Sequence, residues 1–190
     1  KYVSMKNRYM LPMILAFGVI LGCTHSQKVS QSTNPIEQNV EMYPGYSVSK
    51  YKDIYFSGQP ELGDLPKLKK MGITNIVNLR LATEGSYREA KEAAAAKKNE
   101  LNYSHIPMSG RAPLSDELIS KITQAVIKNR SAGKTLIHCG SGQRVAYWAG
   151  GHFYKDHGVS KQEALEIAKR IGLTKEPLVR GLEKYLNINE

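Results

Sequence analysis

The chain has 190 residues, of which 41% are hydrophobic, and its 27 Lys and Arg against 17 Asp and Glu give a formal net charge of +10. This length fits one domain that can bury a core, and the ordinary apolar content excludes a disordered or fibrous protein. The positive excess suits an anionic substrate or an anionic lipid surface. We expect no nucleic-acid partner, because the sequence has no stripe of interleaved basic and aromatic residues and no known binding motif.

Residues 1–22 have the features of a secretory signal peptide. Lys6 and Arg8 precede an apolar run, 10–21, which is too short to span a bilayer comfortably and fits the core of a signal. A buried core helix is the alternative, but the basic residues before the run and the polar stretch after it argue against one. The run ends in Ile20-Leu21-Gly22-Cys23, which resembles a bacterial lipobox, where the cysteine is lipidated after cleavage.

Lipidation of Cys23 would hold the exported protein to a bacterial membrane by acyl chains, facing the periplasm or the cell exterior. The stretch 23–42 would then be the lipidated cysteine and a flexible tether, since it is rich in Ser, Gln, Asn and Thr and lacks periodicity. Residues 43–190 would form the domain. Loss of residues 1–22 removes three basic residues and no acidic one, which leaves a net charge of +7.

Strands and helices alternate along the predicted domain. Short apolar and β-branched runs predict strands at about 53–57, 73–79, 103–106 and 134–138. Helical patterns fall at about 61–71, 87–99, 115–129, 145–156, 161–171 and 176–186. Ser115 is the expected N-cap of the third helix, while Gly72 and Gly158 end the first and the fourth. This alternation predicts an α/β fold with a mainly parallel sheet of four to five strands flanked by helices.

A glycine-containing turn joins the predicted strand 134–138 to the helix that follows, and it carries Cys139. Such a turn directs backbone N–H groups and the positive end of the helix dipole toward one point. The nearest anion is the sulfur of Cys139, and a thiolate stabilised in this way is a nucleophile. Arg144 adds a planar fork of donors that matches an oxyanion. The residues between them would bind that oxyanion: Gly140, Ser141, Gly142 and Gln143.

A buried structural cysteine beside a tight turn is the alternative interpretation of Cys139. Other candidates surround the turn. His138 could hold it by hydrogen bonding. Ligands bind beyond the carboxyl ends of strands in open α/β sheets, and Arg80 falls at such an end, either as a second positive group or in an ion pair with Glu84. Arg111 could bind substrate.

The turn resembles the anion-binding loop of cysteine-dependent phosphatases of the protein-tyrosine and dual-specificity type, and of a bacterial phosphatase-like branch in particular. Segments 55–60, 72–80 and 105–108 are similar to that branch's first three strands, so the resemblance covers about 43–190. It implies a cysteine-phosphatase-like fold. It also implies a hydrolase in which Cys139 is the nucleophile and Arg144 the oxyanion clamp, acting on a phosphomonoester through a phosphocysteine intermediate.

A phosphatase normally uses a general acid to protonate the leaving group. The resemblance places it in about 109–116, where the nearby carboxylates are Asp116 and Glu117. Both lie in what is predicted as a first helical turn, where acidic residues are favourable without any catalytic role. Asp116 is therefore only a possible acid.

Two features depart from the phosphatase pattern. Four residues separate Cys139 from Arg144 where the usual loop has five, a length closer to the loops of rhodanese-like sulfurtransferases. Val145 stands where typical phosphatases have Ser or Thr, so a hydroxyl that would stabilise the departing thiolate is missing. Both differences bear on the reaction rather than on the fold.

Three functions therefore stay open for the domain. The first is phosphomonoester hydrolysis, the second is transfer of sulfur through a persulfide on Cys139, and the third is oxyanion binding by a non-catalytic lipoprotein. Each implies an anionic small molecule or a phosphorylated compound as the partner. We expect no cofactor and no metal, because no histidine pair has ligand-like spacing with Cys139.

Overall fold

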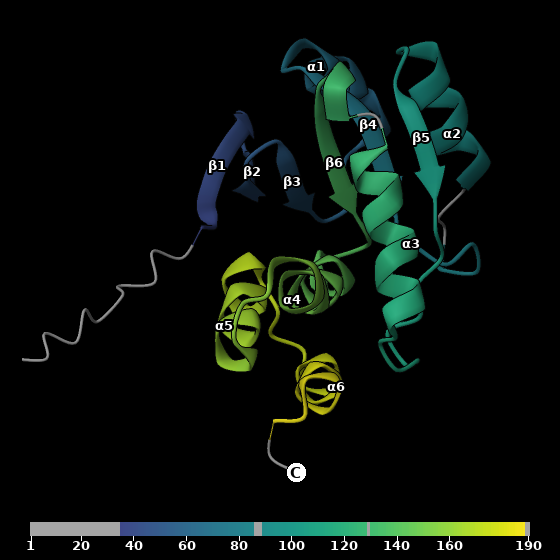
Figure 1. Cartoon of the computed structure of the whole chain (residues 1–190). Helices are drawn as coiled ribbons and strands as arrows, with labels where there is room; N and C mark the ends of the chain where they lie inside the picture. The colour runs from purple at the N-terminus through teal and green to yellow at the C-terminus, as the bar shows by residue number, and fades with distance from the viewer. Residues whose placement is uncertain (1–34, 86–88, 129, 189–190) are drawn as a thin grey trace, which may run out of the picture. The chain divides into compact units, whose positions relative to one another are not determined.

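A six-stranded sheet forms the centre of the computed structural model, which describes residues 35–85, 89–128 and 130–188 (Figure 1). The expected signal peptide and Cys23 lie outside the described residues. The strands follow one another in the sheet in the order β1-β2-β3-β6-β4-β5. Their bounds are β1 (Glu37–Tyr43), β2 (Tyr46–Tyr51), β3 (Ile54–Ser57), β4 (Ile73–Asn78), β5 (Asn102–His105) and β6 (Lys134–His138).

The four strands predicted from the sequence are the parallel part of this sheet, which confirms the α/β fold class. β3 pairs in parallel with β6, β6 with β4, and β4 with β5. β1 and β2 add an antiparallel edge, which the sequence did not predict. The sheet therefore has six strands rather than four to five.

The strand β1 corrects the predicted tether, which extended to residue 42. Glu37–Tyr43 pairs with β2, and Val40 lies opposite Val48. Irregular register interrupts the pairing at two places, so the alternation of apolar and polar residues that marks a strand is broken. Met42 and Val48 are nevertheless buried in the core. The folded part of the chain therefore begins before residue 43.

Helices cover both faces of the sheet. α1 (Leu65–Lys70) and α2 (Glu89–Lys98) pack on one face, with a short 3-10 helix, η1 (Leu62–Asp64), before α1. The other face carries α3 (Asp116–Ile127), α4 (Gln143–His157), α5 (Lys161–Ile171) and α6 (Glu176–Leu186), and a second 3-10 helix, η2 (Arg130–Ala132), precedes β6. Figure 1 shows α5 and α6 gathered around α4.

Side chains alternate between the two faces as a strand requires. Phe56 and Ile137 belong to the core on the α3–α6 side, while Tyr55 and Leu136 belong to the core on the α1–α2 side. The strands β3, β4 and β6 are thus buried on both sides, while the edge strand β5 is only partly buried. This explains why β3, β4 and β6 appear in the sequence as apolar runs.

Helix ends agree with the sequence where a local signal marks them. The Ser115 hydroxyl accepts the N–H of Leu118 at 3.2 Å and caps α3. Gly158 ends α4 with a φ of +66°, in the left-handed region that glycine favours. α4 begins at Gln143, two residues earlier than predicted. Among the described residues, no helix is both long and apolar enough to cross a membrane.

The carboxyl ends of the four parallel strands meet at one edge of the sheet. Ser57 and Asn78 both lie beside His138, and Asn78 also lies beside His105. The segments that leave these strands are therefore brought together. They include the loop that begins at Cys139 and the segment around Arg80.

Candidate active site

The loop after β6 places Cys139 directly beyond the end of a buried strand. The Cys139 side chain is a free thiol and is 1% exposed. Gly142 is the N-cap of α4 and has a φ of +80°, a backbone conformation that is strained for residues with a side chain. The first turn of an α-helix has N–H groups without intrahelical partners, so residues 142–144 present donors at this point.

A turn after β3 fixes the back of the loop. The Gln59 N–H donates to the Gly140 carbonyl at 3.1 Å. Because a trans peptide unit points its N–H opposite to its carbonyl, the Ser141 N–H is directed away from that turn. A Cβ on Gly58 would lie only 3.2 Å from the Gly140 oxygen, so a glycine allows this close approach. The segment 55–60 thus supports the loop.

Arg144 lies in the first turn of α4 with its guanidinium held by one carboxylate and two backbone carbonyls. Nη2 donates to Glu84 Oε2 at 2.9 Å, and Nη1 donates to Glu84 Oε1. Nη1 also donates to the carbonyls of Met108 at 3.1 Å and Leu79 at 3.3 Å. Glu84 therefore takes the edge formed by Nη1 and Nη2. The edge formed by Nε and Nη2 is the one suited to a second anion.

The electrostatics of Arg144 connect it to the cysteine. Burial lowers the pKa of the Arg144 guanidinium, but the hydrogen bonds that it donates to Glu84 and the interaction with the Cys139 side chain outweigh that effect and raise it. Arg144 is thus a permanent cation that interacts with the Cys139 side chain.

Glu84 is ionised throughout the neutral pH range. Burial raises its pKa, but hydrogen bonds from Arg144 and from the Leu81 N–H outweigh that effect and hold the pKa at about 2. Arg80 adds an ion pair, with Nε 3.1 Å from Glu84 Oε2. Glu84 therefore carries no proton that it could donate to a leaving group.

A pH dependence of stability follows from this carboxylate. A pKa that falls from the usual 4.5 to about 2 on folding stabilises the native state by up to about 3 kcal/mol above pH 5. That stabilisation should disappear as the pH falls from about 5 to about 2, because the unfolded state then binds the proton more readily. We expect the free energy of unfolding of the wild type and of Glu84→Gln to converge over this range in urea titrations. A difference that does not change with pH would contradict this.

Arg80 forms an ion pair with Glu84, which is one of the two interpretations that the sequence left open. Besides the ion pair, Arg80 Nη1 donates to Gln59 Oε1 at 3.0 Å, and its backbone N–H donates to Asn78 Oδ1. The guanidinium thus links the turn after β3 to the carboxylate that holds Arg144. In these contacts Arg80 is a support for the clamp.

His138 lies behind the loop and is fully buried. Its Nε2 is 3.1 Å from Glu92 Oε1, a close contact that lacks the alignment of a hydrogen bond. Its Nδ1 lies 3.4 Å from the carbonyl oxygen of Cys139. The side chain thus joins the residue that carries the nucleophile candidate to a buried carboxylate.

Glu92 is the principal site residue that the sequence did not reveal. It is 1% exposed and accepts from Gln59 Nε2 at 2.8 Å, Asn78 Nδ2 at 2.7 Å and the Tyr103 hydroxyl at 3.2 Å. Burial raises its pKa, but the contact with His138 and these hydrogen bonds outweigh that effect and lower it.

The sequence of residues 89–98 predicts a solvated helix because Lys, Glu and Ala dominate it. One feature of the sequence could have indicated that Glu92 is buried. Glu92 and Ala96 are four residues apart, so they share a helix face, and both are buried in α2. A glutamate on the buried face of a helix needs partners, and those partners come from the neighbouring strands.

The Gln143 side chain does not belong to the predicted oxyanion site. Its Oε1 accepts the N–H groups of Thr174 and Lys175, both at 2.9 Å, and its Nε2 donates to the Gly172 carbonyl at 2.6 Å. The amide therefore fastens the connection between α5 and α6 to the start of α4. Only the backbone N–H of Gln143 can take part in binding an oxyanion.

Asp116 is engaged away from the loop. Its Oδ1 accepts the Tyr185 hydroxyl at 2.6 Å, and it lies in the first turn of α3, as the sequence predicted. Burial and then this hydrogen bond raise the pKa of Tyr185. Asp116 does not line the cavity beside Arg144.

A cavity of about 690 Å³ opens on Arg144. Loop residues that follow Cys139 form one part of its wall. Arg111, which the sequence proposed as a substrate ligand, forms another part with Ser109 and Gly110. The lining residues are Leu81, Glu84, Ser109, Gly110, Arg111, Gly140, Ser141, Gln143, Arg144, Lys175, Pro177 and Leu178.

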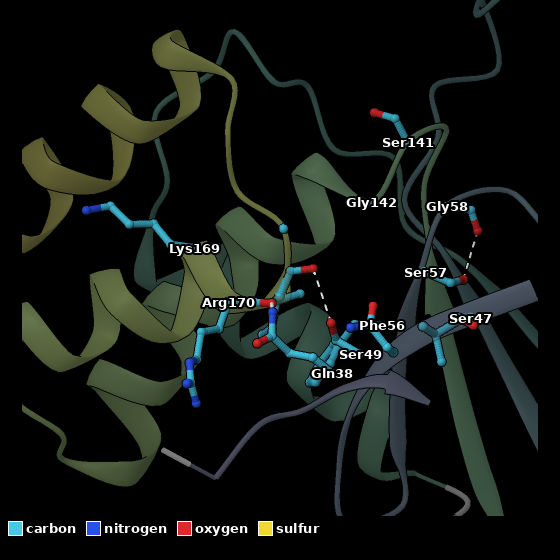
Figure 2. Close-up of a pocket in the computed structure, with 14 residues that line it drawn as sticks. Gln38, Ser47, Ser49, Phe56, Ser57, Gly58, Ser141, Gly142, Lys169 and Arg170 are labelled. Carbon is cyan, nitrogen blue, oxygen red and sulfur yellow. Dashed lines mark hydrogen bonds between the residues drawn. The ribbon is translucent and has the colours of Figure 1, made fainter. Parts of the chain in front are cut away.

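A second cavity, of about 330 Å³, lies on the other side of the loop and also touches Ser141 and Gly142. Figure 2 shows its hydroxyl groups, with Ser49 and Ser57 already bonded to backbone carbonyls. The side chains of Lys169 and Arg170 extend outward from it (Figure 2). The larger cavity is therefore the one in which a cation, Arg144, can bind an anion next to Cys139.

No group of three or more His, Cys, Asp or Glu within the described ranges could hold a metal ion. The larger cavity lies beside the cysteine loop and is lined by the Arg144 guanidinium and by backbone N–H groups of that loop. Together these groups can bind a tetrahedral oxyanion next to a nucleophile.

Comparisons with known proteins point to the same chemistry. A family model described as the Swiss Army Knife protein, DSP-PTPase phosphatase domain, matches residues 47–146, more than half of the chain. The comparison with curated proteins gives no match.

Solved structures share the fold at low sequence identity. TpbA of P. aeruginosa, in complex with pTyr, has a TM-score of 0.62 and 18% identity, and the match covers 83% of this chain and 91% of that one. Tk-PTP in its active form has a TM-score of 0.58 and 22% identity, with 73% and 93% covered. The core catalytic domain of the PP-IP phosphatase SIW14 of S. cerevisiae, in complex with citrate, has a TM-score of 0.52 and 20% identity, with 70% and 80% covered.

Proposed function

Because this chain belongs to the family of the Swiss Army Knife DSP-PTPase phosphatase domain, we propose that it hydrolyses a phosphomonoester with Cys139 as the nucleophile. One observation carries the proposal. Arg144 is held by Glu84 along one edge of its guanidinium and interacts with the sulfur of Cys139, at the end of the strand that leads into the loop.

The reaction would proceed in two displacements. The Cys139 thiolate attacks phosphorus, so that an S–P bond forms and the P–O bond to the leaving group breaks. Water then attacks the phosphocysteine, the S–P bond breaks, and inorganic phosphate and the thiolate are released. Arg144 and the N–H groups of residues 140–144 would stabilise the charge on the phosphoryl oxygens in both steps.

Protonation of the leaving group would fall to solvent. Glu84 is the only carboxylate among the described lining residues, and with a pKa of about 2 it holds no proton at neutral pH. Asp116 is bound to Tyr185 instead. We therefore expect faster turnover of esters whose leaving groups need little protonation, such as aryl phosphates.

Sulfur transfer is the second candidate, and specific features favour it. The loop has four residues between Cys139 and Arg144, Val145 replaces a hydroxyl residue, and the route needs no general acid. The thiolate would attack the outer sulfur of thiosulfate, forming a persulfide and releasing sulfite. The persulfide would then pass its outer sulfur to cyanide or to a thiol.

One assay separates these functions. The purified chain is given an aryl phosphate and, separately, thiosulfate with cyanide, and Cys139→Ser is the control. Phosphate release that the variant loses supports the phosphatase, and thiocyanate formation that the variant loses supports the sulfurtransferase. If the wild type shows neither, the loop only binds an oxyanion.

We further propose that the protein is exported and anchored through lipid on Cys23. The support is the sequence pattern of residues 1–23, which lie outside the described residues. The chain expressed in a bacterium should sediment with membranes, and Cys23→Ser should not carry lipid. Soluble wild-type protein without lipid would refute the anchor and leave the phosphatase proposal untouched.

A further inference from the structure

The larger cavity is lined by more basic residues than are required to bind one phosphate group. Its wall includes Arg111 and Lys175 in addition to Arg144. The one carboxylate among its described lining residues, Glu84, is already paired with Arg80 and Arg144. Within 35–85, 89–128 and 130–188, no carboxylate forms an ion pair with Arg111 or Lys175. Two cations on this wall are thus available to a ligand.

The backbone segments that carry Arg111 and Lys175 lie near Arg144. A Cβ on Gly110 would lie 3.8 Å from Cγ of Arg144 and 3.4 Å from Leu178, so the segment that carries Arg111 lies against the stem of the clamp. The Lys175 N–H donates to Oε1 of Gln143, the residue before Arg144. Two separate contacts therefore place the backbones that carry the two additional cations near the clamp.

The rest of the wall favours an aliphatic ligand. None of the described residues that line this cavity is aromatic, so the ring of an aryl phosphate would find no stacking partner there. The volume of about 690 Å³ is that of a pocket for a whole small molecule rather than for a single phosphate. A polyol would instead meet small and aliphatic side chains such as Ser109 and Pro177.

We propose that the substrate is a small, non-aromatic molecule with at least two phosphate groups. One phosphate would lie at Cys139 and Arg144 for cleavage, while Arg111 and Lys175 would bind another. The inference rests on the proposed phosphatase function and names its substrate class. Arg111 and Lys175 are then the residues that determine specificity, since charge-assisted hydrogen bonds to phosphate are strong.

The test compares two substrates and two double variants of the full chain. Phosphate release is measured for myo-inositol hexakisphosphate, with many phosphates, and for glycerol 2-phosphate, with one. Arg111→Gln/Lys175→Gln removes the two cations, and Lys97→Gln/Lys98→Gln removes two exposed charges from α2 as the matched control. Both variants lower the net charge by the same amount.

The wild type should have a higher kcat/KM for the hexakisphosphate than for glycerol 2-phosphate. In the Arg111 and Lys175 variant the ratio of the two kcat/KM values should fall at least about tenfold, through KM for the hexakisphosphate. The Lys97 and Lys98 variant should keep the wild-type ratio. An unchanged ratio in the first variant, or an equal loss in both, would overturn the inference.

The failure of the proposed function would look different: the wild type would then release no phosphate from either substrate, or Cys139→Ser would release it from both as fast as the wild type. An acidic phosphopeptide is the third probe. If its KM lies below that of the hexakisphosphate and rises in the Arg111 and Lys175 variant, the two cations recognise a phosphoprotein. That result would also overturn the small-molecule proposal.

Discussion

Replacing Arg144 with lysine should lower kcat/KM for an aryl phosphate by about 10²–10³-fold. The guanidinium holds both oxygens of Glu84 and the carbonyls of Leu79 and Met108, and it still has a second edge for substrate. An ammonium group is a point charge with three donors in one cone, so it cannot hold Glu84 and clamp two phosphoryl oxygens together. Initial rates over a range of substrate concentrations measure the effect.

Arg180→Lys is the matched control for this substitution. Arg180 forms an exposed ion pair with Glu176, with Nη1 2.9 Å from Oε1, so the same chemical change is made where no substrate binds. Exposed pairs of this kind contribute little to stability. We expect the control to keep wild-type kcat/KM. If Arg144→Lys also stays within about threefold of the wild type, Arg144 does not act as the oxyanion clamp.

Replacing Glu92 with alanine should lower the free energy of unfolding by about 3–5 kcal/mol. The substitution removes one acceptor from each of Gln59, Asn78 and Tyr103 and takes the neighbouring carboxylate from His138, all behind the Cys139 loop. Each buried hydrogen bond that is lost leaves the desolvation cost of its donor less well offset. Urea denaturation at neutral pH measures the change.

Glu89→Ala is the control that separates the loss of the buried contacts of Glu92 from the effect of a Glu-to-Ala change on α2 itself. Glu89 lies three residues earlier in the same helix and is only partly buried. Because the two variants make the same chemical change in α2, a difference between them reports the buried contacts of Glu92. Equal losses of stability, both under about 1 kcal/mol, would show that the buried network does not support the fold.

Several features of the fold were predictable because their signals are local. The parallel strands β3, β4 and β6 are buried on both faces and therefore appear as apolar runs, as in 73–79 and 134–138. The N-cap at Ser115 and the end of α4 at Gly158 depend on the conformation of a few consecutive residues. β1 and β2 lack such a signal, since only some of their positions are buried and their register is irregular.

The candidate site divides in the same way. Cys139 and Arg144 are five positions apart on one turn, so the sequence alone placed the sulfur and the guanidinium together. The carboxylate that holds Arg144 is 60 residues away, and the one that faces His138 comes from a helix that looked solvated. The amide of Gln143 also turned out to bind residues 172–175, because a connection between two later helices reaches the start of α4.

The sequence by itself determined the α/β class, the parallel strands and the identity of the loop, because each depends on residues that are neighbours in the chain. The tertiary structure alone decided which charges meet beyond the ends of the strands. Parallel pairing aligns Ser57, Asn78, His105 and His138, so the contacts made by Glu84, Glu92 and Arg80 depend on strand order and register. The order of residues along the chain does not by itself specify the order and register of the strands in the sheet.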